Sequence, residues 1–193
     1  MPELRITGGE LGGRRIASPR RSGHVRPTTE RVREAIFSIL GDLGEARVLD
    51  LYCGTGALAI EALSRGAQQA TLVDTRPELA RENVESLDLS ERSGPWHGQR
   101  GRAVVVRSDA LAFLGRAPEG GFDLVLCDPP YELADRTSAQ LAPQLRRVLA
   151  PGGRLMLETS VEQPLEVDLP LLRERRYGDT LVRVHAAEGE GPR

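Results

Sequence analysis

Apolar and polar residues follow one another in a rhythm that predicts alternating strands and helices from residue 46 onwards. Short apolar runs of the buried-strand kind are separated by segments whose apolar residues recur every three or four positions. The predicted strands cover residues 48–52, 70–74, 103–106, 122–127 and 154–158, and a closing pair covers 171–172 and 181–184. Within this region, a helix follows the first strand and ends at residue 63, and further helices cover residues 77–87, 111–114 and 141–149. This alternation indicates an α/β fold with a doubly wound, mostly parallel sheet, whose ligands bind beyond the carboxyl ends of the strands.

The rest of the chain divides into three further segments. Residues 1–27 are rich in glycine and proline and predict a short hairpin and then a basic arm, packed on one domain that spans residues 28–185. Residues 88–102 form a polar loop that is longer than usual for such a fold. Residues 186–193 are expected to be a disordered tail.

A helix is predicted at the start of the domain. Thr28 or Thr29 can cap it, and it runs to about Leu40. Its apolar residues recur at helical spacing and form one face, and Arg31 and Arg33 lie off that face.

The sequence Asp128-Pro129-Pro130-Tyr131 directly follows the predicted strand 122–127. Two consecutive prolines end the strand and fix the backbone. A carboxylate, a free backbone carbonyl and an aromatic ring are therefore held close together. Asp128 and the Pro129 carbonyl can accept both hydrogens of a substrate amine while Tyr131 stacks on a base, which must be unpaired or flipped out. This arrangement predicts methyl transfer to an exocyclic amine, without a metal or a nucleophilic residue.

A glycine turn follows the first predicted strand, in the stretch that contains Asp50, Tyr52, Gly54 and Gly56. A dinucleotide-binding turn requires a third glycine, but Ala59 occupies that position. An aspartate disfavours a pyrophosphate and favours an ammonium group, which S-adenosylmethionine carries without any phosphate. The two glycines allow the backbone to approach a ligand closely, so this stretch predicts a binding site for S-adenosylmethionine.

Two further aspartates end predicted strands. Asp74 ends the second strand and can accept hydrogen bonds from both ribose hydroxyls. Asp109 follows the third strand and can accept from the adenine amine. A helix cap is the alternative function of an aspartate at either position.

Charge is unevenly distributed along the chain. All 26 basic residues are arginine, and the net charge is −2. Residues 1–33 hold eight arginines and three glutamates, a charge of +5, which leaves −7 on the remainder. This asymmetry, together with the planar phosphate-binding fork of arginine, favours a polyanionic partner such as nucleic acid, although a solvated tail is the alternative.

The remaining composition favours a reducing cytoplasm. Cys53 and Cys127 fall where strands end and are expected to be buried thiols. His24, His97 and His185 show no metal-ligand spacing, so no metal is expected. No apolar run reaches the length of a membrane span, and no signal peptide is recognised.

Taken together, these stretches resemble the RsmD family, bacterial methyltransferases of small-subunit ribosomal RNA that modify guanine on N2. The resemblance extends over nearly the whole chain. The residues that carry it are Arg5-Ile6-Thr7-Gly8-Gly9, Gly13-Arg14, Arg26 to Glu34, Asp50 to Gly56, Glu61 to Ala67, Asp128 to Tyr131 and Tyr177-Gly178-Asp179-Thr180. The stretches from Arg26 to Glu34 and from Glu61 to Ala67 are the most specific of these.

The resemblance implies the Rossmann-like fold of class I S-adenosylmethionine-dependent methyltransferases, and a guanine of 16S ribosomal RNA in the assembled small subunit as substrate. Together with the charge of the arm, it indicates a set of RNA contacts: Arg14, Arg15, Arg26, Thr28, Arg31 and Arg33. The chain departs mildly from the family at Asp74, where glutamate is more frequent, and at Cys53, where a small residue is frequent. A monomer is expected.

Two other functions stay open at this point. An adenine-N6 DNA methyltransferase can use the same tetrapeptide, but 193 residues leave little room for a target-recognition domain. A non-catalytic RNA-binding assembly factor would not need the aspartates that this chain retains. Cytosine-C5 chemistry requires a thiolate nucleophile, and Cys127 is expected to point back into its strand.

Overall fold

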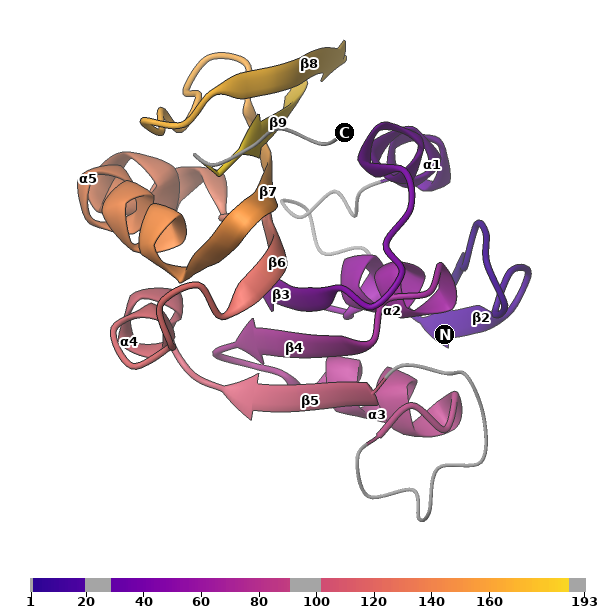
Figure 1. Ribbon diagram of the computed structural model, residues 1–193. Helices are drawn as coiled ribbons and strands as arrows, with labels where there is room; N and C mark the ends of the chain where they lie inside the picture. The colour runs from indigo at the N-terminus through magenta and orange to yellow at the C-terminus, as the bar shows by residue number, and fades with distance from the viewer. Residues whose placement is uncertain (1, 20–28, 91–101, 188–193) are drawn as a thin grey trace.

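The computed structural model describes residues 2–19, 29–90 and 102–187, and its central element is a seven-stranded sheet (Figure 1). The strands lie in the order β5-β4-β3-β6-β7-β9-β8. The first five of these are mutually parallel, whereas β9 pairs antiparallel with both β7 and β8. The bounds are β3 Arg47–Leu51, β4 Gln69–Asp74, β5 Arg102–Arg107, β6 Phe122–Cys127, β7 Leu149–Ser160, β8 Leu171–Tyr177 and β9 Thr180–Ala186. The predicted doubly wound, mostly parallel α/β fold is confirmed.

Helices cover both faces of the sheet, which is why its central strands are apolar on both sides (Figure 1). One core contains apolar residues of α1, α2 and α3 together with one face of the sheet. The other core contains residues of α4 and α5 and the opposite face. Along β6, Leu124 and Leu126 belong to the first core, and Val125 and Cys127 belong to the second. The helices are α1 Glu30–Leu40, α2 Ala57–Ser64, α3 Glu78–Ser86, α4 Ala110–Leu114 and α5 Tyr131–Val148.

The order of the strands fixes where a ligand binds. From β3 the chain moves outward through β4 to β5, and it then returns to the other side of β3 to form β6 and β7. Such a reversal leaves a crevice beyond the carboxyl ends of the strands beside it. The residues after β3, β4, β5 and β6 therefore face one site.

An N-terminal hairpin, β1 Glu3–Arg5 and β2 Arg15–Ala17, is fastened to α2. The Glu61 carboxylate of α2 accepts hydrogen bonds from the backbone N–H of Thr7 (2.9 Å) and from its hydroxyl (2.6 Å). A Cβ on Gly9 would lie 1.8 Å from the Ser64 carbonyl oxygen, so only glycine fits there. The stretches 5–9 and 61–67, which both carry the family resemblance, thus bind each other.

Two elements begin earlier than the sequence predicts. Helix α5 begins at Tyr131, ten residues earlier than predicted, because Pro130 stands at its N-cap, where the missing N–H of a proline costs nothing. Strand β7 begins at Leu149 and passes through the Pro151-Gly152-Gly153 stretch, which was expected to precede the strand. The pairing with β6 shifts register between Phe122 and Leu124, which accommodates these residues.

The position of Arg33 was also predicted wrongly. Thr29 caps α1 as expected and accepts from the Val32 N–H, but Arg33 is only 1% exposed. Its guanidinium donates to the Arg5 carbonyl oxygen (2.7 Å), which joins α1 to the hairpin. A side chain in this position is not available to an RNA phosphate, because its long stem reaches inward to β1.

The division into arm, domain and tail remains a prediction. Residues 20–27 of the arm, residues 91–101 of the long loop and residues 188–193 of the tail lie outside the described residues. Ala186 is the last residue of β9. No helix within the described ranges is long and apolar enough to cross a membrane.

Candidate active site

The glycine turn after β3 is held by Asp74, at the end of β4. One Asp74 carboxylate oxygen accepts from the Gly54 N–H (2.9 Å), and the other accepts from the Arg76 N–H (2.8 Å). The turn requires left-handed backbone, with φ of 60° at Tyr52, 54° at Gly54 and 76° at Gly56. Asp74 is half-buried, and each carboxylate oxygen can accept a further bond, so a ribose contact is compatible with this geometry.

The two glycines have different functions, which corrects the prediction that both admit a ligand. A Cβ on Gly54 would meet nothing nearer than the Tyr52 carbonyl oxygen at 4.0 Å, so the turn is open on that side. A Cβ on Gly56 would lie 2.7 Å from Leu72 and 3.5 Å from Ala80. Gly56 therefore allows α2 to pack closely on β4 and α3, and Gly54 alone leaves space for a ligand.

Asp50 lies beneath the turn and is 2% exposed. One of its oxygens accepts from the Ala59 N–H in the first turn of α2 (3.1 Å). Burial raises the pKa of Asp50 to about 7, and the negative charge of Asp74 adds to this effect, whereas the bond from Ala59 opposes it. A cation bound above the turn would stabilise the ionised carboxylate, so the site favours a ligand with an ammonium or sulfonium group.

Asp109 caps α4, which confirms the alternative function considered for it. Its side chain accepts from the Ala112 N–H (3.1 Å) and is exposed at the carboxyl end of β5. Contact between this carboxylate and an adenine amine remains a prediction.

Asp128 and Pro129 stand beyond the end of β6, on the same edge of the sheet as the glycine turn. Burial, followed by the negative charges of Glu158 and Asp50, raises the pKa of Asp128 well above its ordinary value. Tyr131 is the first residue of α5, and its side chain lies outside the described part of the chain. The structure thus brings Asp50, Asp74 and Asp128 together at the switch point of the sheet.

Cys127 has no part in this site. It is fully buried in the core beneath α4 and α5, on the other face of the sheet from Leu126. Burial raises the pKa of its thiol, which disfavours the thiolate that nucleophilic catalysis requires. The prediction of a buried thiol is confirmed.

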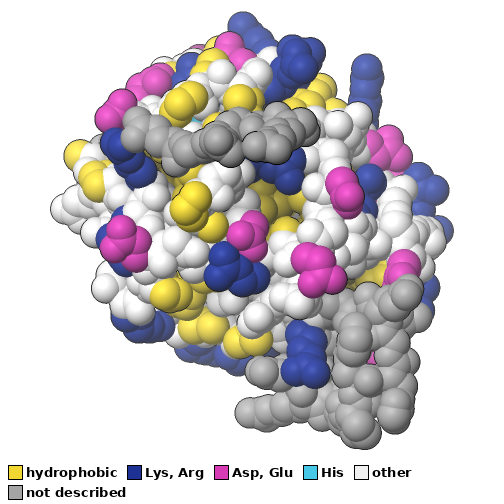
Figure 2. All heavy atoms as spheres, in the orientation of Figure 1, with side chains coloured by type: hydrophobic (Ala, Val, Ile, Leu, Met, Phe, Trp, Pro, Cys, Tyr) yellow, Lys and Arg dark blue, Asp and Glu magenta, His cyan; other side chains and the backbone are white. Residues whose placement is uncertain are grey.

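The candidate RNA contacts are divided between exposed and buried positions. Arg14 and Arg15 are exposed on the hairpin, and Arg31 is exposed on α1. Arg26 and Thr28 lie outside the described residues. On the face shown in Figure 2, arginines are interspersed with acidic side chains. Strand β8 carries three further exposed arginines, Arg173, Arg175 and Arg176.

Sequence reasoning missed two polar residues near the site. Asn83 of α3 is 2% exposed, and its amide donates to the Ala17 and Thr55 carbonyl oxygens (3.0 and 2.9 Å), which joins the hairpin to the glycine turn. Glu158 lies near the end of β7 and is 6% exposed. An acid at the carboxyl end of a predicted strand was the available signal for Glu158, whereas a lone asparagine in an amphipathic helix gave none.

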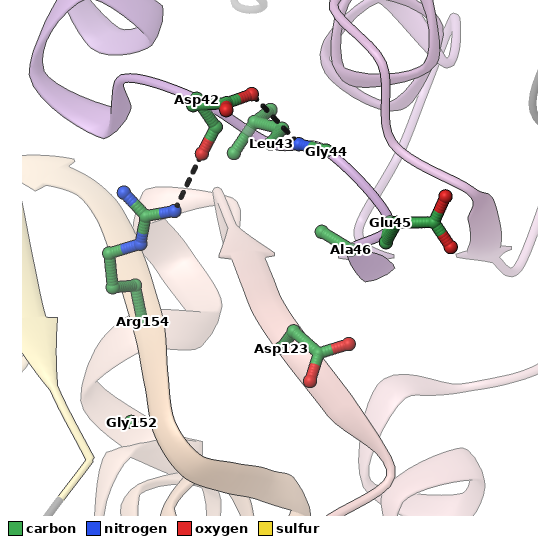
Figure 3. Close-up of a pocket in the computed structure, with 8 residues that line it drawn as sticks. All are labelled: Asp42, Leu43, Gly44, Glu45, Ala46, Asp123, Gly152 and Arg154. Carbon is green, nitrogen blue, oxygen red and sulfur yellow. Dashed lines mark hydrogen bonds between the residues drawn. The ribbon is translucent and has the colours of Figure 1, made fainter. Parts of the chain in front are cut away.

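A hollow of about 330 Å³ lies at the opposite edge of the sheet (Figure 3). The segment before β3, together with Asp123, Gly152 and Arg154, lines it. The Arg154 guanidinium donates to the Asp42 carbonyl oxygen (3.2 Å), so polar groups in this hollow already bind one another. It lies at the amino ends of β3 and β6 and is separate from the candidate site.

The strand order and the acids at its switch point define the fold of a class I methyltransferase. A solved structure described as a putative methyltransferase, yhhF, from Escherichia coli superposes with a TM-score of 0.78 at 29% identity, covering 98% of this chain and 100% of that one.

The family follows from the sequence comparison. Residues 4–186 match the family model described as conserved hypothetical protein 95, so the chain belongs to that family, and the resemblance to RsmD proteins is confirmed. "Ribosomal RNA small subunit methyltransferase D" of Escherichia coli K12 is 32% identical over 195 residues, covering 98% of this chain and 92% of the relative. "Putative rRNA methyltransferase YlbH" of Bacillus subtilis is also 32% identical, covering 96% and 100%.

Proposed function

We propose that this protein transfers a methyl group from S-adenosylmethionine to the N2 amine of a guanine in small-subunit ribosomal RNA. The names of its relatives support ribosomal RNA as the substrate, and the family resemblance supports guanine N2. The observation that carries the proposal is the Asp128 carboxylate, whose pKa is raised, beside the turn that Asp74 holds and above the buried Asp50.

The residues of the turn fit the donor. S-adenosylmethionine supplies an electrophilic methyl group on a sulfonium and has an ammonium group but no phosphate. The open side of Gly54 gives the backbone space to approach it, and Asp74, which already accepts from the Gly54 N–H, has the capacity to accept from the ribose hydroxyls as well. Asp50, from beneath the turn, provides negative charge in surroundings of low dielectric.

Asp128 and Pro129 position the acceptor amine. The lone pair of a guanine amine is delocalised into the ring and is weakly nucleophilic. Acceptors that bind both amine hydrogens direct that lone pair at the methyl group and stabilise the positive charge that develops on nitrogen. The N–C bond forms as the C–S bond breaks, and the nitrogen then loses one proton. Because its pKa is raised, the Asp128 carboxylate is suited to accept that proton.

The partner is then the small ribosomal subunit or its RNA, bound in the cytoplasm by a monomer of this protein. The exposed Arg14, Arg15 and Arg31 contact phosphates around the target, since arginine binds phosphate through a planar fork. Arg26 and Thr28 belong to the same segment of the sequence and are included in the proposed contact.

Methyl transfer from labelled S-adenosylmethionine to unmodified small subunits, free ribosomal RNA and DNA tests the proposal, with nucleoside analysis of the products. N2-methylguanosine from a ribosomal substrate is the expected product. N6-methyladenine in DNA would instead show the alternative enzyme. Cofactor binding without transfer to any of these substrates would contradict the proposal and favour an assembly factor.

A further inference from the structure

A second carboxylate lies beside Asp128. Strands β6 and β7 pair in parallel, and their last pair is Cys127 opposite Leu157. Asp128 directly follows Cys127, and Glu158 directly follows Leu157, so the two acids are next to one another at this edge. Neighbouring strands lie about 4.8 Å apart, and paired residues direct their side chains to the same face. The negative charge of Glu158 is the largest electrostatic influence on Asp128 after burial, which agrees with this proximity.

The face of the sheet follows from the residues before the pair. Cys127 and Leu157 belong to the core under α4 and α5, whereas Leu126 and Met156 belong to the core under α1 and α2. Alternation along β7 therefore directs Glu158 to the side of α1 and α2, the side of its partner Val182 in β9. Asp128 follows Cys127 at the end of β6, within reach of the charge of Glu158. Asp50 pairs with Leu126 and faces the same side.

Two adjacent carboxylates match one base edge and not the other. Guanine carries its N2 amine next to an N1–H, so both neighbouring groups on that edge donate. Adenine carries its N6 amine next to an N1 lone pair, which a carboxylate repels. A glutamate carboxylate can accept about four hydrogen bonds, so contacts within the protein leave capacity for a base.

We infer that Glu158 accepts the N1–H of the target guanine and thereby selects guanine, on the premise that guanine N2 is the methylated atom. Asp128 and Pro129 accept hydrogen bonds from the N2 amine, and Glu158 accepts the hydrogen bond from N1 beside it. A base with a lone pair at N1 leaves the buried Glu158 carboxylate facing an acceptor.

The test compares guanine with 2-aminopurine, which keeps the 2-amine but has a lone pair at N1. Each base is placed by ligation at the mapped target position of ribosomal RNA, and kcat/KM is measured for both. The wild-type protein should prefer guanine by about 10- to 100-fold, as expected for a hydrogen bond to a charged group. Glu158→Gln can donate its amide hydrogen to the N1 lone pair, so this preference should fall to about threefold or less.

Controls separate this selectivity from a structural function of Glu158. Glu162→Gln, at an exposed position four residues further on, should leave the preference unchanged. Affinity for S-adenosylmethionine should be the same in the wild-type and Glu158→Gln proteins. An equal loss of kcat/KM on both bases in Glu158→Gln would overturn the inference while leaving the proposed function intact.

A conservative variant keeps the test decisive if Glu158→Gln does not fold. Glu158→Asp retains the charged acceptor and should retain the preference for guanine at a lower rate. A Glu158→Asp protein that binds cofactor but methylates both bases equally would overturn the inference. A wild-type protein without activity on guanine would overturn the proposed function, and this inference with it.

Discussion

Two groups of buried acids in this protein show how differently a fold can use negative charge. Glu61 of α2 is fully buried, and it accepts four hydrogen bonds, two from Thr7 and two from the Arg65 guanidinium. At the carboxyl edge of the sheet, burial instead raises the pKa values of Asp50 and Asp128, and the negative charges of neighbouring acids add to this effect. No Arg–carboxylate ion pair within the described residues involves Asp50 or Asp128.

The difference separates a structural group from a functional one. A carboxylate whose charge is satisfied inside the chain stabilises the fold and has little left to offer a ligand. Carboxylates that repel one another lower the stability of the folded protein, and a bound cation or N–H donor reduces this repulsion. The comparison therefore predicts opposite effects on stability when an acid is removed from each group.

The largest effect is expected for Glu61→Ala. Removing this carboxylate leaves the Thr7 N–H without its acceptor and the Arg65 guanidinium without its charged partner, and it weakens the attachment of the hairpin to α2. The free energy of unfolding should fall by about 3 kcal/mol or more, as for other buried charged pairs that lose one partner. Urea unfolding measures this value. Glu34→Ala, on the exposed face of α1, is the matched control and should change it by less than about 0.5 kcal/mol.

Asp50→Asn should have the opposite effect on the cofactor-free protein. The folded pKa of Asp50 is about 7, above the ordinary value, so the folded state holds the proton more tightly than the unfolded state. The penalty for ionising Asp50 is absent below about pH 4, grows as pH rises to about 7, and is constant above that, with an upper limit of about 4 kcal/mol.

The asparagine variant lacks this penalty. Its thermal midpoint should therefore equal that of the wild type near pH 4 and exceed it at pH 8, while its stabilisation by S-adenosylmethionine should be smaller. Thermal unfolding at both pH values, with and without the cofactor, measures both effects. An Asp50→Asn protein that is less stable than the wild type by the same amount at both pH values would contradict the predicted contrast between Asp50 and Glu61.

A smaller effect is expected for the exposed arginines of the hairpin and α1. Replacing Arg14, Arg15 or Arg31 with alanine removes at most one phosphate contact, so the slope of log K against log salt should fall by about 1 per variant. RNA binding over a series of salt concentrations measures this slope. Arg102→Ala, at the exposed start of β5, should leave the slope unchanged, and so should Arg33→Ala if that protein folds. Unchanged slopes for all three exposed arginines would exclude this surface from RNA binding.

The sequence was sufficient for the sheet and for bringing most of the candidate site to one edge of it, because both depend on local patterns. Alternating apolar runs identified five parallel strands, and acids near the carboxyl ends of those strands indicated Asp50, Asp74 and Asp128 as candidate site residues. The position of Arg33 was missed because helical periodicity marks apolar residues only, and the Arg5 carbonyl that accepts from Arg33 lies 28 residues away in sequence.

Other features depended on contacts that no local pattern contains. The first ten residues of α5 follow two prolines, and the helix contains Pro143, so the sequence favoured a later start. The packing function of Gly56 became visible only with Leu72 and Ala80 beside it. The position of Glu158 beside Asp128 depends on the register in which β6 and β7 pair, and sequence periodicity does not determine that register.

The most direct test of the account is a comparison of Asp128→Ala with Asp123→Ala, at the two ends of the same strand. Asp123 forms an ion pair with Arg47 (2.9 Å) at the amino edge, far from the turn. Turnover of ribosomal substrate and affinity for S-adenosylmethionine are measured for both variants. Asp128→Ala should lose about 10²-fold or more in kcat with cofactor affinity within about threefold, and Asp123→Ala should match the wild type in both. An Asp128→Ala protein with wild-type kcat would contradict the claim that the carboxylate at the end of β6 performs the chemistry.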